Sequence, residues 1–273
     1  MTILYIVPTP IGNLKDMTFR AIEVLQSVSV IAAEDTKTSA KLLKHYEIET
    51  PMISYHKFNE RQRTDLILKK LHSREDVAVI SDAGTPGISD PASIIISEAI
   101  AAGIRVETLP GATAFVPALV SSGLDCDKFY FAGFLPDKEK LRDKLLTEIS
   151  EYSGSIIFYE APHRILKTLK LLFNFFGNRK VVVARELSKI YETYVRSDLK
   201  TLNEHPEEIT IKGEFVIILE GKIVAELTEE YITGILEKQF EAGASLKSAV
   251  KETTKKTGEN KNRIYEIALK LTR

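Results

Sequence analysis

The sequence predicts an α/β protein built from two α/β domains and a small helical C-terminal unit. Its 273 residues exceed a typical single domain of about 100 to 200 residues. Short β-branched runs alternate with stretches of helical period over most of the chain, which is typical of βαβ units around a mostly parallel sheet. From about residue 225 onward the strand signals vanish and only helical spacing remains.

The first domain is expected to span residues 1–117, with strands at residues 3–7, 28–33, 77–80 and 105–109. Between the first two strands, Asp16 is expected to be the N-cap of a helix, because Ala21, Val24 and Leu25 fall on one helical face. Another helix is expected after the polar residues 59–61.

The second domain is expected to span residues 118–224, because the strand pattern restarts after residues 121–123. Its expected strands lie at residues 129–134, 155–159, 181–184 and 215–219. Helices are expected at residues 137–150 and 163–176, and the second should end near Gly177.

The third unit, residues 225–273, is expected to be helical and to resemble a helix-turn-helix. Apolar residues repeat at helical spacing before and after Gly258, which interrupts the pattern. Residues 245–273 carry eight basic and three acidic side chains, an excess of five positive charges. This segment is therefore either a module that contacts RNA or a solvated helical tail.

Charge and composition restrict the partners of the chain. Its 37 basic and 38 acidic side chains give a net charge of −1, so it should not coat DNA or RNA by bulk charge, and any polyanion must be held locally. No apolar run approaches the roughly 20 residues that a membrane helix needs. The first seven residues lack the basic segment of a secretory signal, and the single cysteine, Cys126, cannot form an internal disulfide. We therefore expect a cytoplasmic protein without a membrane or DNA partner.

Several common enzyme classes are disfavoured by missing motifs. The five histidines are scattered, and none forms a pair at metal-ligand spacing, so no metal site is expected. The sequence contains no GxxxxGKS/T motif, and no GxGxxG follows an expected strand. A P-loop NTPase and an ordinary dinucleotide dehydrogenase are therefore both disfavoured.

The loops that follow the expected strands of the first domain are the candidate ligand-binding segments, because ligands of parallel sheets lie beyond the carboxyl ends of the strands. In the first loop Pro10 restricts φ and Gly12 allows close approach to a ligand, although a stiff strand-to-helix turn explains both. The second loop contains the carboxylates Glu34 and Asp35, of which Asp35 is also a plausible helix N-cap.

The third loop, residues 81–91, is the most informative. It contains two glycines and two prolines, and its Asp82 is suited to accept hydrogen bonds from ligand hydroxyls or an ammonium group. The fourth loop, residues 110–114, is also rich in small residues. As neighbours at one sheet edge, these loops predict a site for a small ligand.

Two loops of the second domain add charged residues. Residues 158–164 and 184–189 each place an acidic and a basic side chain just past an apolar strand. Structural ion pairs at the junction of the two domains are an equally consistent interpretation.

These segments together resemble a known family. The strings TPIGNLKD, AEDT, ISYHKFNE, SDAGTPGISDP, LPGATA, FYEAPHR, ARELSK and KGEF, with residues 133–136, are similar in sequence and order to class III S-adenosylmethionine-dependent methyltransferases of the tetrapyrrole-methylase type. Among these, the chain resembles the enzymes that methylate RNA of the small ribosomal subunit. The similarity extends over residues 3 to about 220, and the helical tail is also similar.

The resemblance implies two α/β domains with S-adenosylmethionine bound in the cleft between them, and a homodimer. It implies 2′-O-methylation of a cytidine ribose in the decoding region of 16S rRNA, within the small ribosomal subunit. The contacts to the methyl donor that it implies, beside Pro10 and Gly12, are Asp82, Ala83, Gly84, Thr85, Pro86, Ala112, Thr113, Tyr159, Ala184 and Gly213.

Because a sulfonium is an activated methyl donor, the enzyme must chiefly orient the ribose hydroxyl, and a general base should help to deprotonate it. No metal is required. The candidate bases are Glu160, ranked first because it follows a strand of the second domain, and then Glu34, Asp35 and Glu186. The candidate RNA contacts are Arg61, Arg164 and Lys189 around the cleft and Lys255, Lys256 and Arg263 in the tail.

Two alternative functions fit the same pattern. A tetrapyrrole methylase would use the same fold and donor with a macrocyclic acceptor, but it would not need the basic tail. A non-catalytic RNA-binding or assembly factor would keep the fold but would have no reason to retain the loop SDAGTP. Binding of the methyl donor distinguishes this second alternative from an enzyme.

Overall fold

The computed structural model describes residues 2–90, 92–223 and 227–272. The chain divides into two compact units, residues 1–222 and 223–273. Pro91 of the third loop, Arg273 of the basic tail and the expected boundary after residue 224 lie outside the described residues. Among the helices described, none is both long and apolar enough to cross a membrane.

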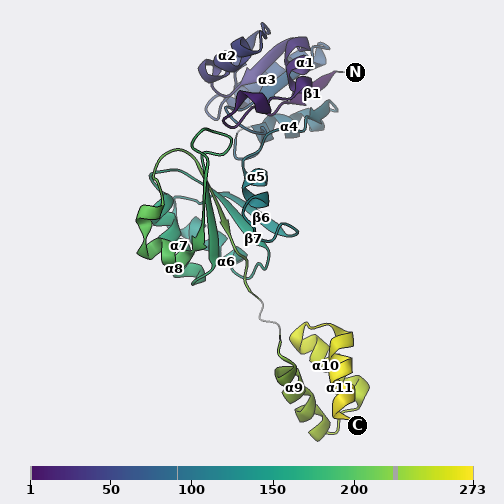
Figure 1. Ribbon diagram of the computed structural model, residues 1–273. Coiled ribbons are helices and arrows are strands. Elements are labelled where there is room, and N and C mark those ends of the chain that lie inside the picture. The colour runs from purple at the N-terminus through teal and green to yellow at the C-terminus, as the bar shows by residue number, and fades with distance from the viewer. Residues whose placement is uncertain (1, 91, 224–226, 273) are drawn as a thin grey trace. The chain divides into compact units, whose positions relative to one another are not determined.

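The first sheet is parallel throughout, as expected, with the strand order β3-β2-β4-β1-β5. Figure 1 labels β1 together with the helices α1 to α4 of the same part of the chain. Its strands are β1 (Ile3–Ile6), β2 (Val30–Ala33), β3 (Met52–Ser54), β4 (Val77–Ile80) and β5 (Arg105–Thr108). Strand β3 was not expected, because its three residues at the sheet edge are too few to show a β-branched run.

Helices cover both faces of this sheet. They are η1 (Leu14–Asp16), α1 (Phe19–Ser27), α2 (Thr36–His45), α3 (Glu60–His72) and α4 (Ala92–Ala101). Successive strand residues point to opposite faces, so Ala32 packs with α3 and α4, whereas Ile31 packs with α1 and α2. Helix α4 was missed because its consecutive isoleucines show no helical spacing.

The predicted N-cap at Asp16 is wrong. Asp16 is the last residue of the short helix η1, and α1 is capped by Thr18, whose side chain accepts a hydrogen bond from the N–H of Ala21. Thr18 directly precedes the first residue of α1, which is the N-cap position, whereas Asp16 lies two residues further back.

The second sheet is mixed, with the order β6-β7-β10-β8-β9. Its strands are β6 (Phe129–Phe134), β7 (Ser155–Glu160), β8 (Lys180–Arg185), β9 (Thr193–Asp198) and β10 (Phe215–Leu219). Only β6 and β7 are parallel, so a mostly parallel arrangement is wrong for this domain. Residues 186–192 connect β8 to β9, and this connection is too short for the crossover that parallel strands require.

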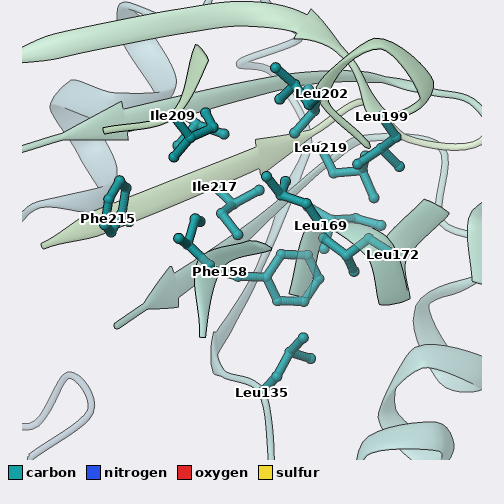
Figure 2. Close-up of a cluster of buried hydrophobic side chains, with 14 of the residues drawn as sticks. Leu135, Phe158, Leu169, Leu172, Leu199, Leu202, Ile209, Phe215, Ile217 and Leu219 are labelled. Atoms are coloured by element: carbon teal, nitrogen blue, oxygen red, sulfur yellow. The ribbon is translucent and has the colours of Figure 1, made fainter. Parts of the chain in front are cut away.

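The helices of the second domain lie on both faces of its sheet. They are α5 (Phe115–Val120), α6 (Glu139–Ile149), α7 (Ile165–Phe176), α8 (Leu199–Glu204) and η2 (Pro206–Glu208). Helices α6, α7 and α8 cover one face, and Figure 2 shows Leu169 of α7 and Leu199 of α8 in the core that they form with Phe158 of β7. Helix α5 packs on the opposite face through Ala118 and Leu119. The expected boundary after residue 117 therefore falls within a helix that packs on the second sheet.

The C-terminal unit consists of α9 (Glu229–Glu241), α10 (Leu246–Thr257) and α11 (Lys261–Leu271), which pack against one another. Helix α10 ends at Gly258, as expected, because this residue adopts the left-handed conformation at φ 70°. Three residues join α10 to α11. The predicted helical unit is confirmed, with α9 as a third helix that the sequence pattern did not locate.

Candidate active site

Hydrogen bonds hold the loops after β1 and β4 together at one edge of the first sheet. The backbone N–H of Thr9 donates to the carbonyl of Gly84, and the N–H of Gly84 donates back to the carbonyl of Thr9, both at 2.9 Å. The buried hydroxyl group of Thr9 also donates to the carbonyl of Ser81 at 3.0 Å. The sequence therefore places two predicted ligand loops in one fixed arrangement.

The loops after β2 and β5 are attached to the same β4 loop. The N–H of Asp35 donates to Oδ1 of Asp82 at 3.0 Å. The hydroxyl group of Thr85 donates to the carbonyl of Ala112, also at 3.0 Å. All four loops singled out in the first domain thus meet at the carboxyl ends of adjacent parallel strands.

A cavity of about 510 Å³ opens among these loops and the facing loops of the second sheet. This volume lies within the range typical of small-molecule and cofactor sites. The residues that line it are Ile11, Glu34, Ser81, Asp82, Ala83, Gly84, Thr85, Ile88, Ser89, Asp90, Thr113, Ala114, Phe134, Tyr159, Glu160, Ala161, Pro162, Leu187, Glu214, Phe215 and Val216.

The sequence-predicted contacts to the methyl donor divide into two groups. Those that line the cavity are Asp82, Ala83, Gly84, Thr85, Thr113 and Tyr159. Those outside its lining are Pro10, Gly12, Pro86, Ala112, Ala184 and Gly213. Ala184 belongs to the buried cluster on the α5 face of the second sheet, of which Leu187, Val216 and Tyr159 line the cavity and Ala184 does not.

Gly12 and Gly213 serve close packing of protein segments. A Cβ atom at Gly12 would collide with the side chain of Lys189, and one at Gly213 would collide with the carboxylate of Glu186. Both glycines therefore let neighbouring loops approach, and the interpretation of Gly12 as part of a stiff structural turn fits better than direct contact with a ligand.

Glu214 and Val216 line the cavity at the start of β10 and were not among the expected site residues. The loops expected from the strand pattern all follow strands, as parallel pairing requires, and Gly213 was expected only from the family resemblance. Because β10 runs antiparallel to β7 and β8, its first residue, Phe215, pairs with the last residues of both, Glu160 and Arg185. The beginning of β10 therefore lies at the same sheet edge as the ends of its neighbours.

The hydroxyl oxygen of Thr113 is buried and has no hydrogen-bond partner among the described residues. Such a group costs about 1 to 3 kcal/mol when it is left unsatisfied. Because Thr113 lines the cavity, a ligand with a polar group at this position would satisfy it. The residues present therefore fit the methyl donor that the resemblance implies.

Replacement of Thr113 by valine should have opposite effects on stability and binding. We expect the free energy of unfolding without ligand to rise by about 1 kcal/mol, because a buried unpaired hydroxyl is removed. Affinity for S-adenosylmethionine should fall by about threefold to tenfold, which corresponds to one lost hydrogen bond. Denaturant unfolding and calorimetry measure the two quantities, and an unchanged affinity would remove Thr113 from the ligand contacts.

Glu34 is the candidate base whose environment best suits proton transfer. Its carboxyl group lines the cavity, and burial together with the nearby Asp82 raises its pKa above the usual value. Burial and the nearby Asp35 likewise raise the pKa of Asp82. A carboxyl group with a raised pKa accepts a proton more readily, which is the property expected of a general base.

Glu160, which the sequence analysis ranked first, is engaged in structural contacts. Its side chain is fully buried and forms an ion pair with Nε of Arg164 at 3.1 Å. It also accepts hydrogen bonds from the N–H of Ala161 at 2.8 Å and from the hydroxyl of Thr168 at 2.6 Å. Accepting a proton would weaken all three contacts, so the geometry favours the structural ion pair that the sequence left open.

The other two candidate bases also hold structural positions. Asp35 is the N-cap of α2 and accepts a hydrogen bond from the N–H of Lys37 at 2.7 Å, which lowers its pKa. Glu186 accepts a hydrogen bond from Lys189 at 2.8 Å, which lowers its pKa, and another from the N–H of Glu214. Neither carboxylate lines the cavity.

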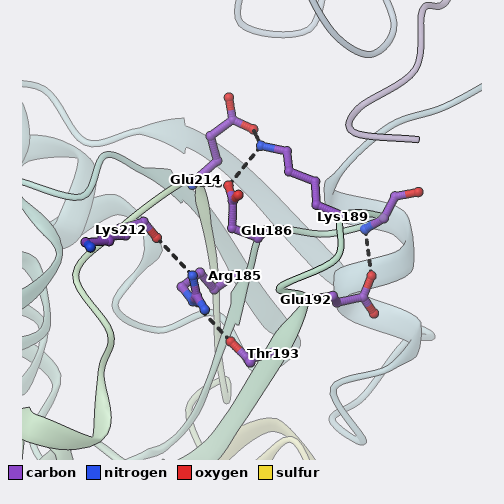
Figure 3. A network of polar contacts seen from close by, with 8 residues as sticks. Arg185, Glu186, Lys189, Glu192, Thr193, Lys212 and Glu214 are labelled. Carbon is purple, nitrogen blue, oxygen red and sulfur yellow. Dashed lines mark hydrogen bonds and ion pairs between the residues drawn. The ribbon is translucent and has the colours of Figure 1, made fainter. Parts of the chain in front are cut away.

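Figure 3 shows that Lys189 lies between Glu186 and Glu214, with Nζ at 2.8 and 2.9 Å from their carboxylates. Partial burial acts to lower the pKa of Lys189, but these hydrogen bonds outweigh it and raise the pKa. Lys189 therefore stays protonated and is unsuited to act as a base. The backbones of Glu186 and Ser188 both adopt positive φ, at 53° and 64°, which costs free energy and often marks functional loops.

Two of the predicted RNA contacts, Arg61 and Arg164, differ in whether their side chains are exposed or held in ion pairs. Arg61 is exposed at the start of α3 but does not line the cavity. Arg164 forms ion pairs with Glu160 and Asp137 and donates to the carbonyl of Leu135.

In the C-terminal unit, Lys255 and Lys256 are exposed and form no ion pair within residues 227–272. Arg263 instead pairs with Glu259 and donates to the carbonyl of Leu227, which indicates a structural role. The acidic helix α9 offsets much of the tail's charge, and the free positive charge is concentrated on α10.

Comparison with known proteins identifies the family. A family model described as Tetrapyrrole (Corrin/Porphyrin) Methylases matches residues 3–203. Ribosomal RNA small subunit methyltransferase I of Synechocystis sp. is 44% identical and covers 99% of both chains. The protein of the same name from Bacillus subtilis is 41% identical over 97% of this chain and 94% of its own. The chain belongs to the tetrapyrrole methylase family, and within it to the group of ribosomal RNA small subunit methyltransferase I. Its membership confirms the resemblance, the predicted fold class and the predicted methyltransferase activity.

Solved structures share the fold of this family member at low sequence identity. Diphthine synthase has a TM-score of 0.66 at 13% identity, covering 81% of this chain and 90% of that chain. Cobalt precorrin-4 methyltransferase has a TM-score of 0.60 at 18% identity over 80% and 94%. Uroporphyrin-III C-methyl transferase from Thermus thermophilus, complexed with S-adenyl homocysteine, has a TM-score of 0.57 at 16% identity over 81% and 97%.

Proposed function

We propose that the chain transfers a methyl group from S-adenosylmethionine to the 2′-hydroxyl of a cytidine ribose in the decoding region of 16S rRNA. The observation that carries this proposal is the pairing, in one cavity, of the unpartnered Thr113 hydroxyl with the Glu34 carboxyl group of raised pKa. The first is suited to bind a ligand, and the second to move a proton. The names of the curated relatives support rRNA of the small subunit as the acceptor.

S-adenosylmethionine supplies an activated methyl group on a sulfonium, which needs no metal for transfer. Asp82 would accept hydrogen bonds from hydroxyl or ammonium groups of the donor, and Thr113 would contribute its free hydroxyl. Tyr159, whose pKa is raised by burial, lines the apolar part of the cavity. These residues hold the donor in a fixed position, and orientation is the largest contribution that the site has to make.

Glu34 would accept the proton of the ribose 2′-hydroxyl as the ribose oxygen takes the methyl group, whose bond to the donor sulfur breaks and leaves a neutral thioether. Its raised pKa favours this transfer, since the driving force grows as the pKa of the base rises. Burial raises the pKa of Glu34 most, and Asp82 raises it further by repelling a negative charge on Glu34. Lys189 stays protonated and is placed to donate to a phosphate or ribose group at the Glu214 side of the cavity.

The proposal is tested with small ribosomal subunits from cells that lack the enzyme. Purified protein and labelled S-adenosylmethionine should place one label on the 2′-oxygen of a cytidine, which mapping of the modified ribose locates. Uroporphyrinogen offered as an alternative acceptor should stay unlabelled. Label in the macrocycle and not in the subunit would instead establish a tetrapyrrole methylase. The ribosomal substrate would place the enzyme in the cytoplasm.

We further propose that the chain is a homodimer. Val116 and Val120 of α5 are exposed one helical turn apart, and Phe129 is exposed on the edge strand β6. Apolar residues gathered at a sheet edge are typical of a two-fold interface. Light scattering should give twice the chain mass of 30.6 kDa. A mass of one chain at micromolar concentration would reject the dimer.

A further inference from the structure

A second hollow surface begins where the active-site cavity ends. Phe134 and Pro162 line the cavity, and the residues that follow each of them, at 135–137 and 163–164, line a smaller pocket of about 230 Å³. This pocket continues into another of about 370 Å³, and the two share Arg142, Lys167 and Leu171. Together they form a groove between α6 and α7, which we call the α6/α7 groove.

Basic side chains from both helices face this groove. Arg164, Lys167 and Lys170 recur every three residues and therefore lie along one side of α7, while Arg142 comes from α6. Lys167 and Lys170 are exposed and form no ion pair within the described part of the chain. They are therefore free to bind an anion.

Of the three acidic residues that line the groove, Asp137 and Asp143 contact its arginines, and Glu139 forms no ion pair within the described part of the chain. Asp137 pairs with Arg164 at 2.8 Å, and Asp143 contacts Nε of Arg142 at 3.4 Å, while Glu139 lies in the first turn of α6. Nε of Arg142 is nevertheless buried without a hydrogen-bond partner among the described residues. An oxygen atom of a ligand in the groove would supply the hydrogen-bond acceptor that this N–H lacks.

Aromatic side chains lie at both ends of the path. Phe134 is 50% exposed at the active-site cavity, and Phe175 is 40% exposed in the far pocket. A positively charged groove combined with exposed aromatic rings is the usual composition of sites for single-stranded nucleic acid, because phosphates contact the cations and bases stack on the rings.

We propose that the α6/α7 groove binds the phosphodiester backbone of the RNA strand that leaves the active-site cavity. This inference rests on the proposed function, since it takes the acceptor to be a ribonucleotide within a longer strand. Lys167, Lys170 and Nε of Arg142 contact the phosphates, and Phe175 stacks on a base. The groove therefore selects a polymer over a free nucleoside, although it takes no part in methyl transfer.

The test compares two double variants of equal charge. Lys167→Gln with Lys170→Gln removes the free cations of the groove, and Lys140→Gln with Lys144→Gln removes two exposed lysines of α6 that do not line it. The probe is a fluorescent single-stranded oligoribonucleotide of about twelve nucleotides, a length within the usual site size. Its binding is titrated over a salt series without methyl donor.

The groove variant should lose about tenfold in affinity near physiological salt. Its slope of log K against log salt should become shallower by about 1.4, because each single-strand phosphate contact contributes about 0.7. The control variant should bind like the wild type, and both variants should keep their affinity for S-adenosylmethionine. Equal losses in the two variants would indicate a general charge effect and overturn the proposal.

If the α6/α7 groove binds a protein and not RNA, the same two measurements show a different pattern. If the groove variant binds the oligoribonucleotide like the wild type but binds small subunits less tightly, the groove contacts a protein and the RNA assignment is overturned. Failure of the proposed function is distinguishable, because it appears as absent methyl transfer by the wild-type protein to subunits. The oligoribonucleotide measurement does not depend on that reaction.

Discussion

Replacing Glu34 by glutamine should lower the rate of methyl transfer by about 10²- to 10⁴-fold, the range typical of a lost general base. Affinity for S-adenosylmethionine should be retained, since the amide keeps the shape of the side chain. Single-turnover transfer to small subunits measures the rate separately from product release. Glu23→Gln is the matched control, because Glu23 is exposed on α1 outside the cavity.

The pH dependence of this variant provides a second observable. Burial and the nearby Asp82 raise the pKa of Glu34, so wild-type activity should fall as the pH decreases through that raised value, while the glutamine variant should lack this step. A raised carboxyl pKa means that Glu34 favours the folded state below its unfolded pKa and loses this contribution as the pH rises through the folded pKa. At neutral pH the variant should therefore be at least as stable as the wild type.

The variant Glu160→Gln distinguishes Glu34 from Glu160 as the general base. It breaks the buried ion pair with Arg164, so thermal unfolding should show a clear loss of stability. Its transfer rate, measured on folded protein, should fall much less than that of Glu34→Gln. If Glu160→Gln loses more rate than Glu34→Gln, the general base is Glu160.

Replacing four lysines of α10 by glutamine should weaken binding to small subunits by about 10²-fold near physiological salt. Lys247, Lys251 and Lys255 lie one turn apart on an exposed face, and Lys256 lies beside them. Four lost phosphate contacts should make the slope of log K against log salt shallower by about 3. Affinity for S-adenosylmethionine should not change.

Substitution is preferable to removing residues from 245 onward, because a deletion would expose the apolar side of α9. The control changes four exposed lysines of the α/β unit outside both the cavity and the α6/α7 groove, namely Lys41, Lys44, Lys69 and Lys128. Filter binding across a salt series measures both sets. If the α10 variant and the control show the same affinity and slope, α10 is a solvated face and does not contact RNA.

The first sheet shows how far local sequence determines this protein. Its buried strands are short apolar runs, and parallel strands bring their carboxyl ends to one edge. The loops after β1, β2, β4 and β5 were therefore predictable as neighbours, and Asp82, Gly84 and Thr113 do line one cavity. Strand β3 and helix α4 were not predictable, because neither shows a distinct period.

The second sheet shows where local pattern stops being informative. Strand β10 looks the same in sequence whether it pairs parallel or antiparallel, since all five of its residues are buried. Its direction decides that Glu214 reaches the cavity from the start of a strand. The direction depends on long-range pairing with β7 and β8, which the sequence near residue 214 does not encode.

The sequence alone determined most strands of the two sheets, the family and a set of candidate acidic residues. Only the tertiary structure distinguishes the environments of those carboxylates. A carboxyl group's proton affinity depends on its burial and its neighbours, and these come from distant segments: Arg164 and Thr168 for Glu160, and Asp82 for Glu34. The same holds for the α6/α7 groove, because Arg142 and Lys167 face one another only after both helices pack on the second sheet.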